Sequence, residues 1–327
     1  MSIYKLQRDE LNAYRSIYDA IQHQKTSAVI PRLLDKDVFK IYKKALSESD
    51  FGYLYNQNQI CTRTFGGSEC TLEFTMCEEV NGNRIAVDMR VIPEIEAIIE
   101  KAKKQSTIRG AVQSVYEYFV QHFEYAHNEK ENLKYHSGLS VFLYRKSVCE
   151  GFAMAFATVL NRLGVPCGIV NGESNHDGMQ GGHAWNIVKI GNEIYHMDVT
   201  WDICLKNSKA MLFDYFLLDD KTIAKDHGWK DGSIPAARDA GLEMYYENGL
   251  CCTDRESVVR LVSDGFKRNQ SEIGFRYTGK EYTKFFQTDN IKSVFRKAMD
   301  ISKVGNCKIE YTTNKSTGTV RVAAVYC

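Results

Sequence analysis

The chain has almost no net charge and no long hydrophobic run. Its 327 residues include 42 Lys and Arg against 41 Asp and Glu, which leaves a formal net charge of +1. This balance gives no electrostatic reason to expect nucleic acid or an anionic membrane as a partner. No stretch approaches the roughly 18 apolar residues of a transmembrane helix, and Met1–Glu10 contain no apolar signal region. We therefore expect a cytoplasmic protein, unless a leader has been removed from the N-terminus.

Proline is scarce, and the cysteines are not spaced for zinc or for a disulfide framework. The chain has four prolines, no low-complexity linker and no internal repeat, which favours tightly packed modules. Its ten cysteines form no Cys-x-x-Cys pair and no His/Cys cluster with zinc-ligand spacing. In a chain of this size without a leader, they indicate reduced thiols in a cytoplasm. We expect no cofactor and no metal ion.

The length predicts two or three modules, and hydrophobic residues at 44% are sufficient for packed cores. We expect these modules at residues 1–107, 108–242 and 243–327. In the first, helices reach to about residue 50. Alternating patterns then predict strands that include Thr71–Met76 and Ile85–Val91, and a helix begins at Pro93. Nothing in this module resembles a ligand motif, which favours a scaffold over a substrate-selecting domain.

The last module has the predicted order βαβαββ. Met244–Cys252 suggests a strand, and Thr253 with Glu256 reads as a capping box that opens a helix to about Lys267. The order indicates a small α+β module with its helices on one face of a sheet. Recognition of a polypeptide by addition to the sheet edge and simple stabilisation of the core are equally compatible with it.

Most of the functional information lies between residues 147 and 202. Apolar residues recur at helical spacing from Phe152 to Leu163, so Cys149 lies at the N-terminus of a helix. Unpaired N–H groups and the helix dipole favour a thiolate there, and the same groups can later hold an oxyanion. Gly151 is expected to leave space beside the sulfur for a substrate.

A hairpin supplies partners for the thiol. His183–Ile190 and Ile194–Val199 read as strands joined by a type II′ turn at Gly191-Asn192. A two-residue turn pairs Trp185 with Asp198 and places His183 and Asp198 on one face as diagonal neighbours. Asp198 would then accept a hydrogen bond from one imidazole nitrogen and leave the other facing the thiol.

Other polar residues nearby have simpler interpretations. His176 falls in a Gly-rich polar stretch and reads as a surface histidine, because a base must be held rigidly. His196 shares a strand face with Asp198, and a supporting role is favoured for it. Asp202 reads as a capping or turn residue. Trp185 reads as core or as a wall of the site.

At these residues the chain resembles the bacterial transglutaminase-like superfamily, over about residues 110–225. The segments that carry the resemblance are Val148–Ala153, Leu163–Cys167, His183–Val188 and Tyr195–Asp202. The resemblance implies an α+β fold with a papain-like core, in which a helix carrying the cysteine packs on an antiparallel sheet. Around that core, the residue patterns predict an N-terminal α/β region and a small C-terminal α+β module. By residue it implies Cys149 as nucleophile, His183 as base and Asp198 as the acid that orients the base.

The second oxyanion donor is left open. Such folds take it from upstream of the nucleophile, where Tyr144, Tyr135 and His136 all qualify. Tyr144, Gly151 and Trp185 are our candidates for the oxyanion and substrate site.

The resemblance does not decide the reaction. The superfamily includes transglutaminases, peptidases, deamidases, peptide N-glycanases and inactive members, and the active ones share thiolate attack on an amide. Water is the default acyl acceptor, which favours a cysteine peptidase or amidase acting on peptides or proteins. A transglutaminase or deamidase is the alternative, and a non-catalytic binding scaffold is the second. No acidic loop has a calcium-binding pattern. Substrate identity and oligomeric state are not predicted.

Overall fold

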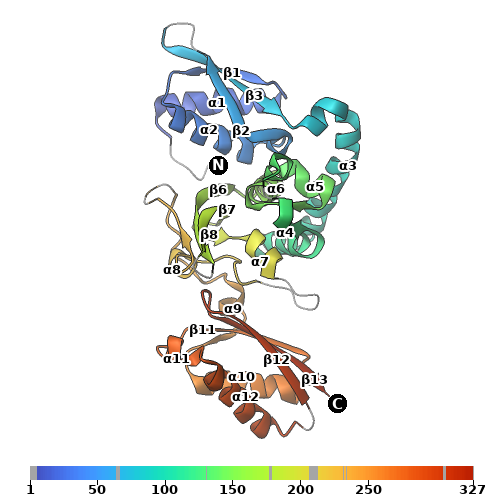
Figure 1. Ribbon diagram of the computed structural model, residues 1–327, viewed down its shortest axis with the longest axis vertical. Coiled ribbons are helices and arrows are strands. Elements are labelled where there is room, and N and C mark those ends of the chain that lie inside the picture. The colour runs from blue at the N-terminus through green and yellow to red at the C-terminus, as the bar shows by residue number, and fades with distance from the viewer. Residues whose placement is uncertain are drawn as a thin grey trace. The chain divides into compact units, whose positions relative to one another are not determined.

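The computed structural model describes residues 6–63, 67–129, 131–176, 179–205, 213–230, 232, 234–304 and 307–326. The chain divides into two compact units, coloured from blue to red along the sequence in Figure 1. The first unit comprises Met1–Asp220 and His227–Asp239, and the second comprises Lys221–Asp226 and Ala240–Cys327. Within the described residues, no helix is both long enough and apolar enough to span a membrane.

The first unit begins with two helices and a three-stranded antiparallel sheet. Their bounds are α1 (Arg8–Gln22), β1 (Ser27–Pro31), α2 (Asp35–Glu48), η1 (Gly52–Leu54), β2 (Tyr55–Arg63) and β3 (Glu69–Met76). The strands lie in the order β1-β3-β2. Tyr42 of α2 packs on Phe74 of β3, with 5.4 Å between ring centroids. The helices were expected from their apolar stripes, whereas β1 was not expected.

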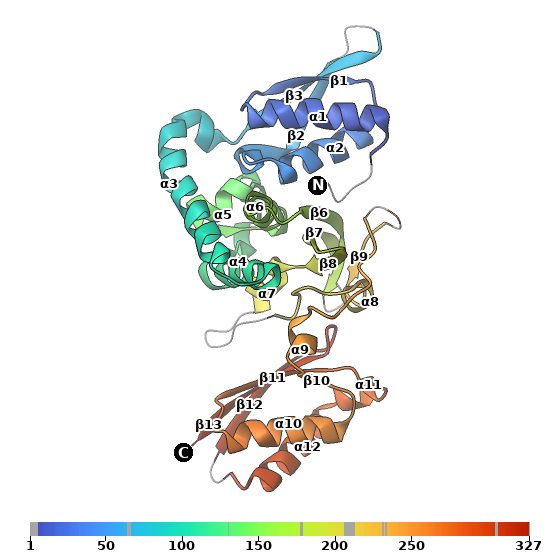
Figure 2. The same ribbon diagram turned by 180° about the vertical axis from the view of Figure 1, so that it is seen from behind.

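The strand expected over Ile85–Val91 is wrong, because these residues belong to the helix α3 (Glu78–Lys103). The apparent alternation hides an i, i+4 pattern: Val87 and Val91 are buried, whereas Ile85 and Met89 are 72% and 74% exposed. The backbone is non-helical at Asn83, where the helix kinks. Figures 1 and 2 show α3 running alongside the next helices, and Arg90 Nη2 donates to the Leu143 carbonyl at 2.7 Å.

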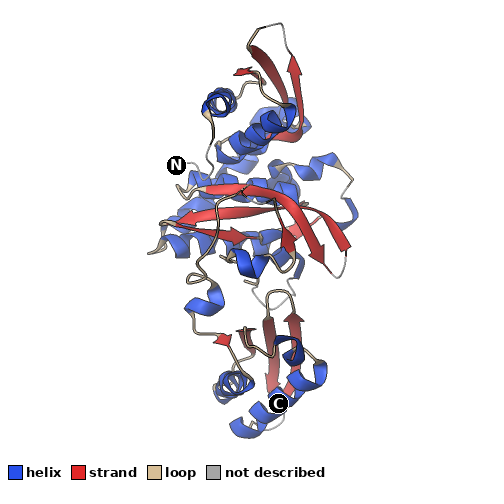
Figure 3. Cartoon of the chain, turned by 90° about the vertical axis from the view of Figure 1, so that its left-hand side faces the viewer, coloured by secondary structure: helices blue, strands red, loops and turns tan. Residues whose placement is uncertain are grey.

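The rest of the first unit is a helical layer packed on a four-stranded antiparallel sheet, which gives an α+β fold (Figure 3). Its elements in chain order are α4 (Ile108–His122), β4 (Glu124–Tyr125), η2 (His127–Glu129), η3 (Leu133–His136), α5 (Gly138–Tyr144), β5 (Lys146–Ser147), α6 (Cys149–Arg162), β6 (Cys167–His176), β7 (Met179–Ile190), β8 (Glu193–Met197), α7 (Val199–Leu205) and β9 (His227–Gly228). The short helix α8 (Asp220–Ile223) precedes β9, and its residues from Lys221 onwards belong to the second unit. The sheet has the order β8-β7-β6-β9. Asn186 of β7 donates to the Ala153 carbonyl of α6 at 2.9 Å, which ties the helix to the sheet.

The hairpin of β7 and β8 has the expected register. Ile190 pairs with Glu193 around Gly191-Asn192, and the ladder continues to the pair of Asn186 with Met197. Gly191 has a φ of 62° while Asn192 is not in the left-handed region, as a type II′ turn requires. The second strand ends at Met197, two residues earlier than expected. Asp198 N–H donates instead to the Tyr215 carbonyl, and α7 begins at Val199.

The second unit contains the predicted βαβαββ order with short additions. Its elements are α9 (Met244–Glu247), β10 (Cys251–Cys252), α10 (Arg255–Lys267), β11 (Glu272–Tyr277), α11 (Tyr282–Phe285), α12 (Thr288–Ser302), β12 (Cys307–Asn314) and β13 (Thr319–Tyr326). The sheet order is β10-β11-β13-β12. Residues 244–247, expected in a strand, are helical because the Glu243 carboxylate caps their N–H groups. The capping box of α10 is formed by Asp254 and Ser257, one residue later than expected.

Candidate active site

Cys149 is the first residue of α6 and is partly exposed. The segment before it is held by η3: Val148 N–H and Ser147 Oγ both donate to the Tyr135 carbonyl, at 3.1 and 2.6 Å. β5 also pairs with β4, so Ser147 lies opposite Tyr125. Because the first N–H groups of a helix have no partner within it, Cys149 lies where backbone donors and the helix dipole favour a thiolate and an oxyanion.

Gly151 does not leave space for a substrate, contrary to our expectation. A Cβ atom at this position would lie 2.0 Å from Ser147 Oγ and 2.6 Å from the Ser137 carbonyl oxygen. The protein itself therefore fills the space beside this glycine. Gly151 is needed because α6 approaches the backbone of the preceding segment closely.

His183 and Asp198 meet as the hairpin register predicts. His183 Nε2 lies 2.7 Å from Asp198 Oδ2, and the two side chains are 7% and 0% exposed. Because Nε2 contacts Asp198, Nδ1 is the nitrogen left to face Cys149, and the interaction with Cys149 contributes to the raised pKa of His183. Cys149, His183 and Asp198 thus follow the order needed by a nucleophile, its base and the group that orients the base.

Charge in this buried cluster favours an imidazolium. Burial by itself lowers the pKa of His183, but the charge of Asp198 and hydrogen bonds to Asp198 and Cys149 outweigh it and raise the pKa. Burial likewise raises the pKa of Asp198, yet the His183 charge and hydrogen bonds from two histidines hold it well below its usual value. The charges of the cluster therefore favour a protonated His183 beside an ionised Asp198.

The backbone around Asp198 fixes its position. Trp201 N–H donates to Asp198 Oδ1 at 3.1 Å, and the Tyr116 hydroxyl donates to the Asp198 carbonyl at 3.1 Å. Asp202 is fully buried and accepts from the Tyr116 hydroxyl at 2.5 Å and from the N–H groups of Asp214 and Tyr215, both at 3.2 Å. Asp202 therefore organises the chain behind Asp198, which agrees with the structural role expected for it.

A second histidine contacts Asp198, and the sequence analysis did not predict it. His227 Nε2 lies 3.0 Å from Asp198 Oδ2, the same oxygen that contacts His183, and the His227 side chain is completely buried. It lies in β9, 29 residues after Asp198 and outside the segments that carry the resemblance. The only local signal in the sequence is a histidine between charged residues and Gly228, which does not distinguish it from a surface residue.

Trp185 and His196 support the site from behind. The Trp185 ring lies 6.0 Å from the His183 ring at an interplanar angle of 19°, and Trp185 Nε1 donates to His196 Nδ1 at 2.9 Å. His196 Nε2 contacts Asp220 Oδ1 at 2.8 Å. Trp185 is 1% exposed, so it belongs to the core beside His183, and its assignment to the substrate site stays a prediction. His196 bonds to Trp185 and Asp220, which agrees with the supporting role expected for it. The side chain of His176 lies outside the described residues.

The hydroxyls of Tyr144 and Tyr135 are both bonded to carboxylates. The Tyr144 hydroxyl donates to Glu79 Oε1 at 2.6 Å, and the Tyr135 hydroxyl donates to Glu129 Oε1 at 3.0 Å. Tyr144 also lines a cavity of about 450 Å³ whose lining contains neither Cys149 nor His183. The Tyr144 hydroxyl therefore binds Glu79 at the wall of this cavity.

Tyr125 is a further hydroxyl at the site that was missed in the sequence. It follows from the β4–β5 pairing, which places it opposite Ser147, two residues before Cys149. Burial and then the charges of Cys149, Cys204 and Asp198 raise the pKa of Tyr125. The pairing with Ser147 brings Tyr125 next to the segment that leads into Cys149.

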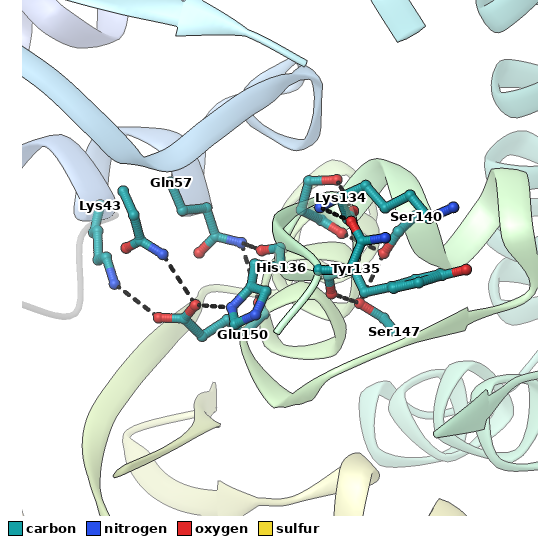
Figure 4. Close-up of polar contacts among 11 residues, drawn as sticks. Lys43, Gln57, Lys134, Tyr135, His136, Ser140, Ser147 and Glu150 are labelled. Atoms are coloured by element: carbon teal, nitrogen blue, oxygen red, sulfur yellow. Dashed lines mark hydrogen bonds and ion pairs between the residues drawn. The ribbon is translucent and has the colours of Figure 1, made fainter. Parts of the chain in front are cut away.

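The residue after the candidate nucleophile joins the N-terminal elements to the core (Figure 4). Glu150 Oε2 contacts His136 Nδ1 at 2.8 Å and accepts from Asn58 Nδ2 at 3.1 Å, while Glu150 Oε1 contacts Lys43 Nζ at 3.3 Å. Gln57 Nε2 donates to the carbonyls of His136 and Glu150, at 2.8 and 3.2 Å. Side chains from α2 and β2 therefore hold the first turn of α6.

One group of side chains has the spacing of metal ligands within the part of the chain that the structure describes. The donor atoms of His183, Asp198 and His227 lie within 4.8 Å of one another. Each imidazole is hydrogen-bonded to the carboxylate, so the group is satisfied as an all-protein cluster. The expectation of a reaction without a metal stays a prediction.

Comparison with known proteins identifies the segment that carries the site. Residues 96–199 match the model of the transglutaminase-like superfamily, and this range contains Cys149, His183 and Asp198. No curated protein matches the chain.

Three solved structures are similar to parts of the chain. A TGase has 22% identity and a TM-score of 0.31, with 46% of each chain covered. A candidate cysteine protease from Cytophaga hutchinsonii has 14% identity and a TM-score of 0.30, covering 43% of this chain and 61% of that one. The periplasmic domain of TgpA from Pseudomonas aeruginosa, bound to ethylmercury, has 18% identity and a TM-score of 0.27, covering 41% and 55%. The chain thus spans about half of the length of these structures.

Proposed function

This protein carries a domain of the transglutaminase-like superfamily, and we propose that it is a thiol enzyme that attacks amide bonds of peptides or proteins. The observation that carries the proposal is the 2.7 Å contact between Asp198 Oδ2 and His183 Nε2, with Cys149 at the first position of α6 and contributing to the raised pKa of His183. Cys149 is the proposed nucleophile, His183 the proton carrier and Asp198 the group that orients His183.

The first half-reaction forms a thioester. Cys149 Sγ, as a thiolate, attacks the amide carbonyl carbon, and the resulting oxyanion accepts hydrogen bonds from the Cys149 N–H. The C–N bond then breaks as His183 Nδ1 delivers its proton to the leaving amine. Asp198 keeps Nε2 protonated and the ring in place throughout, which its full burial and its hydrogen bonds favour.

The second half-reaction decides the type of enzyme. With water as acceptor, His183 Nδ1 takes a proton from the water as the oxygen attacks the thioester, and a carboxylic acid and the thiol of Cys149 result. An amine in the same place gives a transglutaminase, and attack on a glutamine side chain followed by water gives a deamidase. We favour hydrolysis, because water is present at a partly exposed thiol unless the site excludes it.

A non-catalytic scaffold of the same fold is the competing function. The observation against it is the hydrogen-bonded Cys149, His183 and Asp198, all three in place with the imidazole pKa raised. A scaffold has no need of an imidazolium beside a thiol.

The primary test is alkylation of the full chain by iodoacetamide as a function of pH. The tryptic peptide from Ser147 to Arg162 contains no cysteine other than Cys149, so its modification is followed separately by mass spectrometry. We expect Cys149 to react at about pH 6 far faster than Cys61, an exposed thiol in the same molecule, and His183→Ala to abolish the difference. Equal rates for Cys149 and Cys61 in the folded wild type would refute the enzyme.

The acceptor is then identified by competition. Dimethylated casein is incubated with the protein in ¹⁸O-labelled water, with and without a fluorescent primary amine. Incorporation of ¹⁸O into new carboxyl groups at backbone cleavage sites supports a peptidase, and ¹⁸O at glutamine side chains supports a deamidase. Covalent fluorescence supports a transglutaminase. Cys149→Ala is the control in each arm.

A further inference from the structure

Two imidazoles share one oxygen of Asp198. Nε2 of His183 lies 2.7 Å from Oδ2, and Nε2 of His227 lies 3.0 Å from the same atom. We propose that His227 is a positioning residue that fixes Asp198 so that it, in turn, orients His183. The inference rests on the proposed function and adds a fourth residue to the three that carry it.

His227 is held more firmly than its short strand suggests. It pairs with Ser174 of β6, and its ring is surrounded by those of Trp201, Trp185 and Tyr215, at centroid distances of 4.5, 4.9 and 5.5 Å. Its side chain is completely buried. A ring enclosed in this way keeps one rotamer, so its Nε2–H presents a fixed donor to Asp198.

The sheet is shaped to bring β9 this close. A Cβ atom at Gly172 of β6 would lie 2.2 Å from the Gly228 carbonyl oxygen and 2.7 Å from the Trp185 ring. Gly172 pairs with His183 on β7, while its neighbour Glu173 pairs with Gly228 on β9. Any larger residue at position 172 would push β9 and the Trp185 ring apart, and His227 would move away from Asp198.

The shared oxygen explains what His227 adds. Asp198 Oδ1 accepts from the Trp201 N–H, but that bond alone does not stop the carboxylate from rotating when His183 moves during proton transfer. His227 holds Oδ2 independently of His183. A carboxylate at a fully buried position also needs donors to remain ionised.

The remaining titratable groups around Asp198 belong to other elements. Tyr116 of α4 donates to the Asp198 carbonyl and to Asp202 of α7. Burial, and then the charges of Cys149 and Asp198 among others, raise the pKa of Tyr125 of β4. Among the residues that the structure describes, the side chains that contact Asp198 Oδ2 are those of His183 and His227, so a change at His227 acts directly on that oxygen.

The test compares two substitutions in the full chain. His227→Gln keeps an amide N–H close to the position of Nε2 and cannot become charged, whereas His227→Phe keeps the ring volume and removes the donor. The readout is the pH dependence of Cys149 alkylation, measured on the Ser147–Arg162 peptide. In His227→Phe, we expect the pH below which Cys149 alkylation slows to rise by on the order of one pH unit. In His227→Gln, this pH should stay near that of the wild type. Tyr42→Phe, which removes a buried hydroxyl of α2 that donates to the Asn56 carbonyl and does not touch Asp198, is the control and should leave the profile in place.

The outcomes separate the inference from the proposed function. If Cys149 of the wild type is alkylated no faster than Cys61, the proposed enzyme function is refuted. If wild-type Cys149 is reactive and its pH profile is unchanged in His227→Phe, the role of His227 is overturned while the proposed enzyme stands. Shifts of equal size in His227→Gln and His227→Phe also overturn that role, because the packing of the ring would then explain the effect.

A second readout does not depend on the thiol. In His227→Phe, the pH at which the unfolding free energy begins to fall on the acid side should rise, because the ionised Asp198 loses a hydrogen-bond donor. If this pH is the same as in the wild type, the inference is overturned. If His227→Phe does not fold, His227→Asn replaces it, since its shorter amide cannot reach Oδ2.

Discussion

Glu150 Oε2 and His136 Nδ1 lie 2.8 Å apart, one residue beyond Cys149 (Figure 4). The same carboxylate contacts Lys43 and Asn58, which come from the N-terminal helix α2 and strand β2. The N-terminal elements therefore reach the first turn of the helix that presents the thiol. That this region is a scaffold and not a substrate-selecting domain stays a prediction; the contacts show which atoms of α6 it holds.

Replacing Glu150 by Gln should destabilise the protein in a pH-dependent way. Burial raises the pKa of Glu150, but the bonds to His136, Lys43 and Asn58 outweigh it and lower the pKa from 4.5 to about 2. A depressed pKa stabilises the fold above the unfolded value and loses that effect as the pH falls through the folded value. We expect Glu150→Gln to lose about 1–2 kcal/mol near pH 7, and the difference to vanish towards pH 2.

Urea unfolding at several pH values measures this difference. Glu131→Gln, an exposed carboxylate on the neighbouring segment, is the matched control and should change the unfolding free energy by less than about 0.5 kcal/mol. A difference that is constant from neutral to acid pH would show that Glu150 acts through packing and not through charge.

Gly151→Ala should be strongly destabilising. The added methyl would lie 2.0 Å from Ser147 Oγ and 2.6 Å from the Ser137 carbonyl, and the second is backbone that cannot rotate away. We expect a loss of about 3 kcal/mol or more, seen as a lower midpoint in urea. Gly82→Ala is the control: this helical glycine has nothing within 4 Å of a new Cβ atom, so the substitution should be neutral or stabilise by up to about 1 kcal/mol. Similar losses in both variants would contradict the close approach at Gly151.

Asp198→Asn should slow alkylation of Cys149 while the protein stays folded. The amide removes the negative charge that raises the pKa of His183, and the imidazolium that stabilises the thiolate is lost with it. An opposite charge moves a neighbouring titration by one to three pH units, so we expect a decrease of roughly 10- to 1000-fold at about pH 6.

Asp202→Asn is the comparison for Asp198→Asn. Asp202 is equally buried, and it accepts hydrogen bonds from the Tyr116 hydroxyl and from the N–H groups of Asp214 and Tyr215. It should lower the unfolding free energy by about 1–3 kcal/mol with alkylation within a few-fold of the wild type. If both variants lose Cys149 reactivity to the same extent, the effect of Asp198→Asn comes from a disturbed fold and not from the lost charge beside His183.

The stability of the wild type should decline on the alkaline side because of His183. Its pKa is raised above 6.5 by the charge and hydrogen bonds of its neighbours despite burial. A group with a raised pKa contributes fully below its unfolded value and loses its contribution as the pH rises through the folded value. The unfolding free energy of the wild type minus that of His183→Gln should therefore be largest near pH 6 and shrink above neutrality. A difference that grows with pH would contradict a protonated His183.

Local patterns in the sequence determined the helix that presents Cys149, the hairpin register and the meeting of His183 with Asp198. They succeeded because a two-residue turn leaves one register for the flanking strands, and because helical spacing and a Gly-Pro ending define α6. The same reasoning failed over Ile85–Val91, where four apolar residues fit both a strand and a helix. Only the packing of Val87 and Val91 against the core chose between the two.

Tertiary structure alone decided which distant residues complete the site. His227 reaches Asp198 because β9 adds to the edge of β6, and Lys43 and Asn58 reach Glu150 because the N-terminal elements pack on α6. Gly151 and Gly172 are glycines for the same reason, since each allows a close approach by backbone that is not adjacent to it in sequence. Turn chemistry and periodicity act over a few residues, whereas these contacts depend on how sheet and helices are stacked, which no short segment encodes.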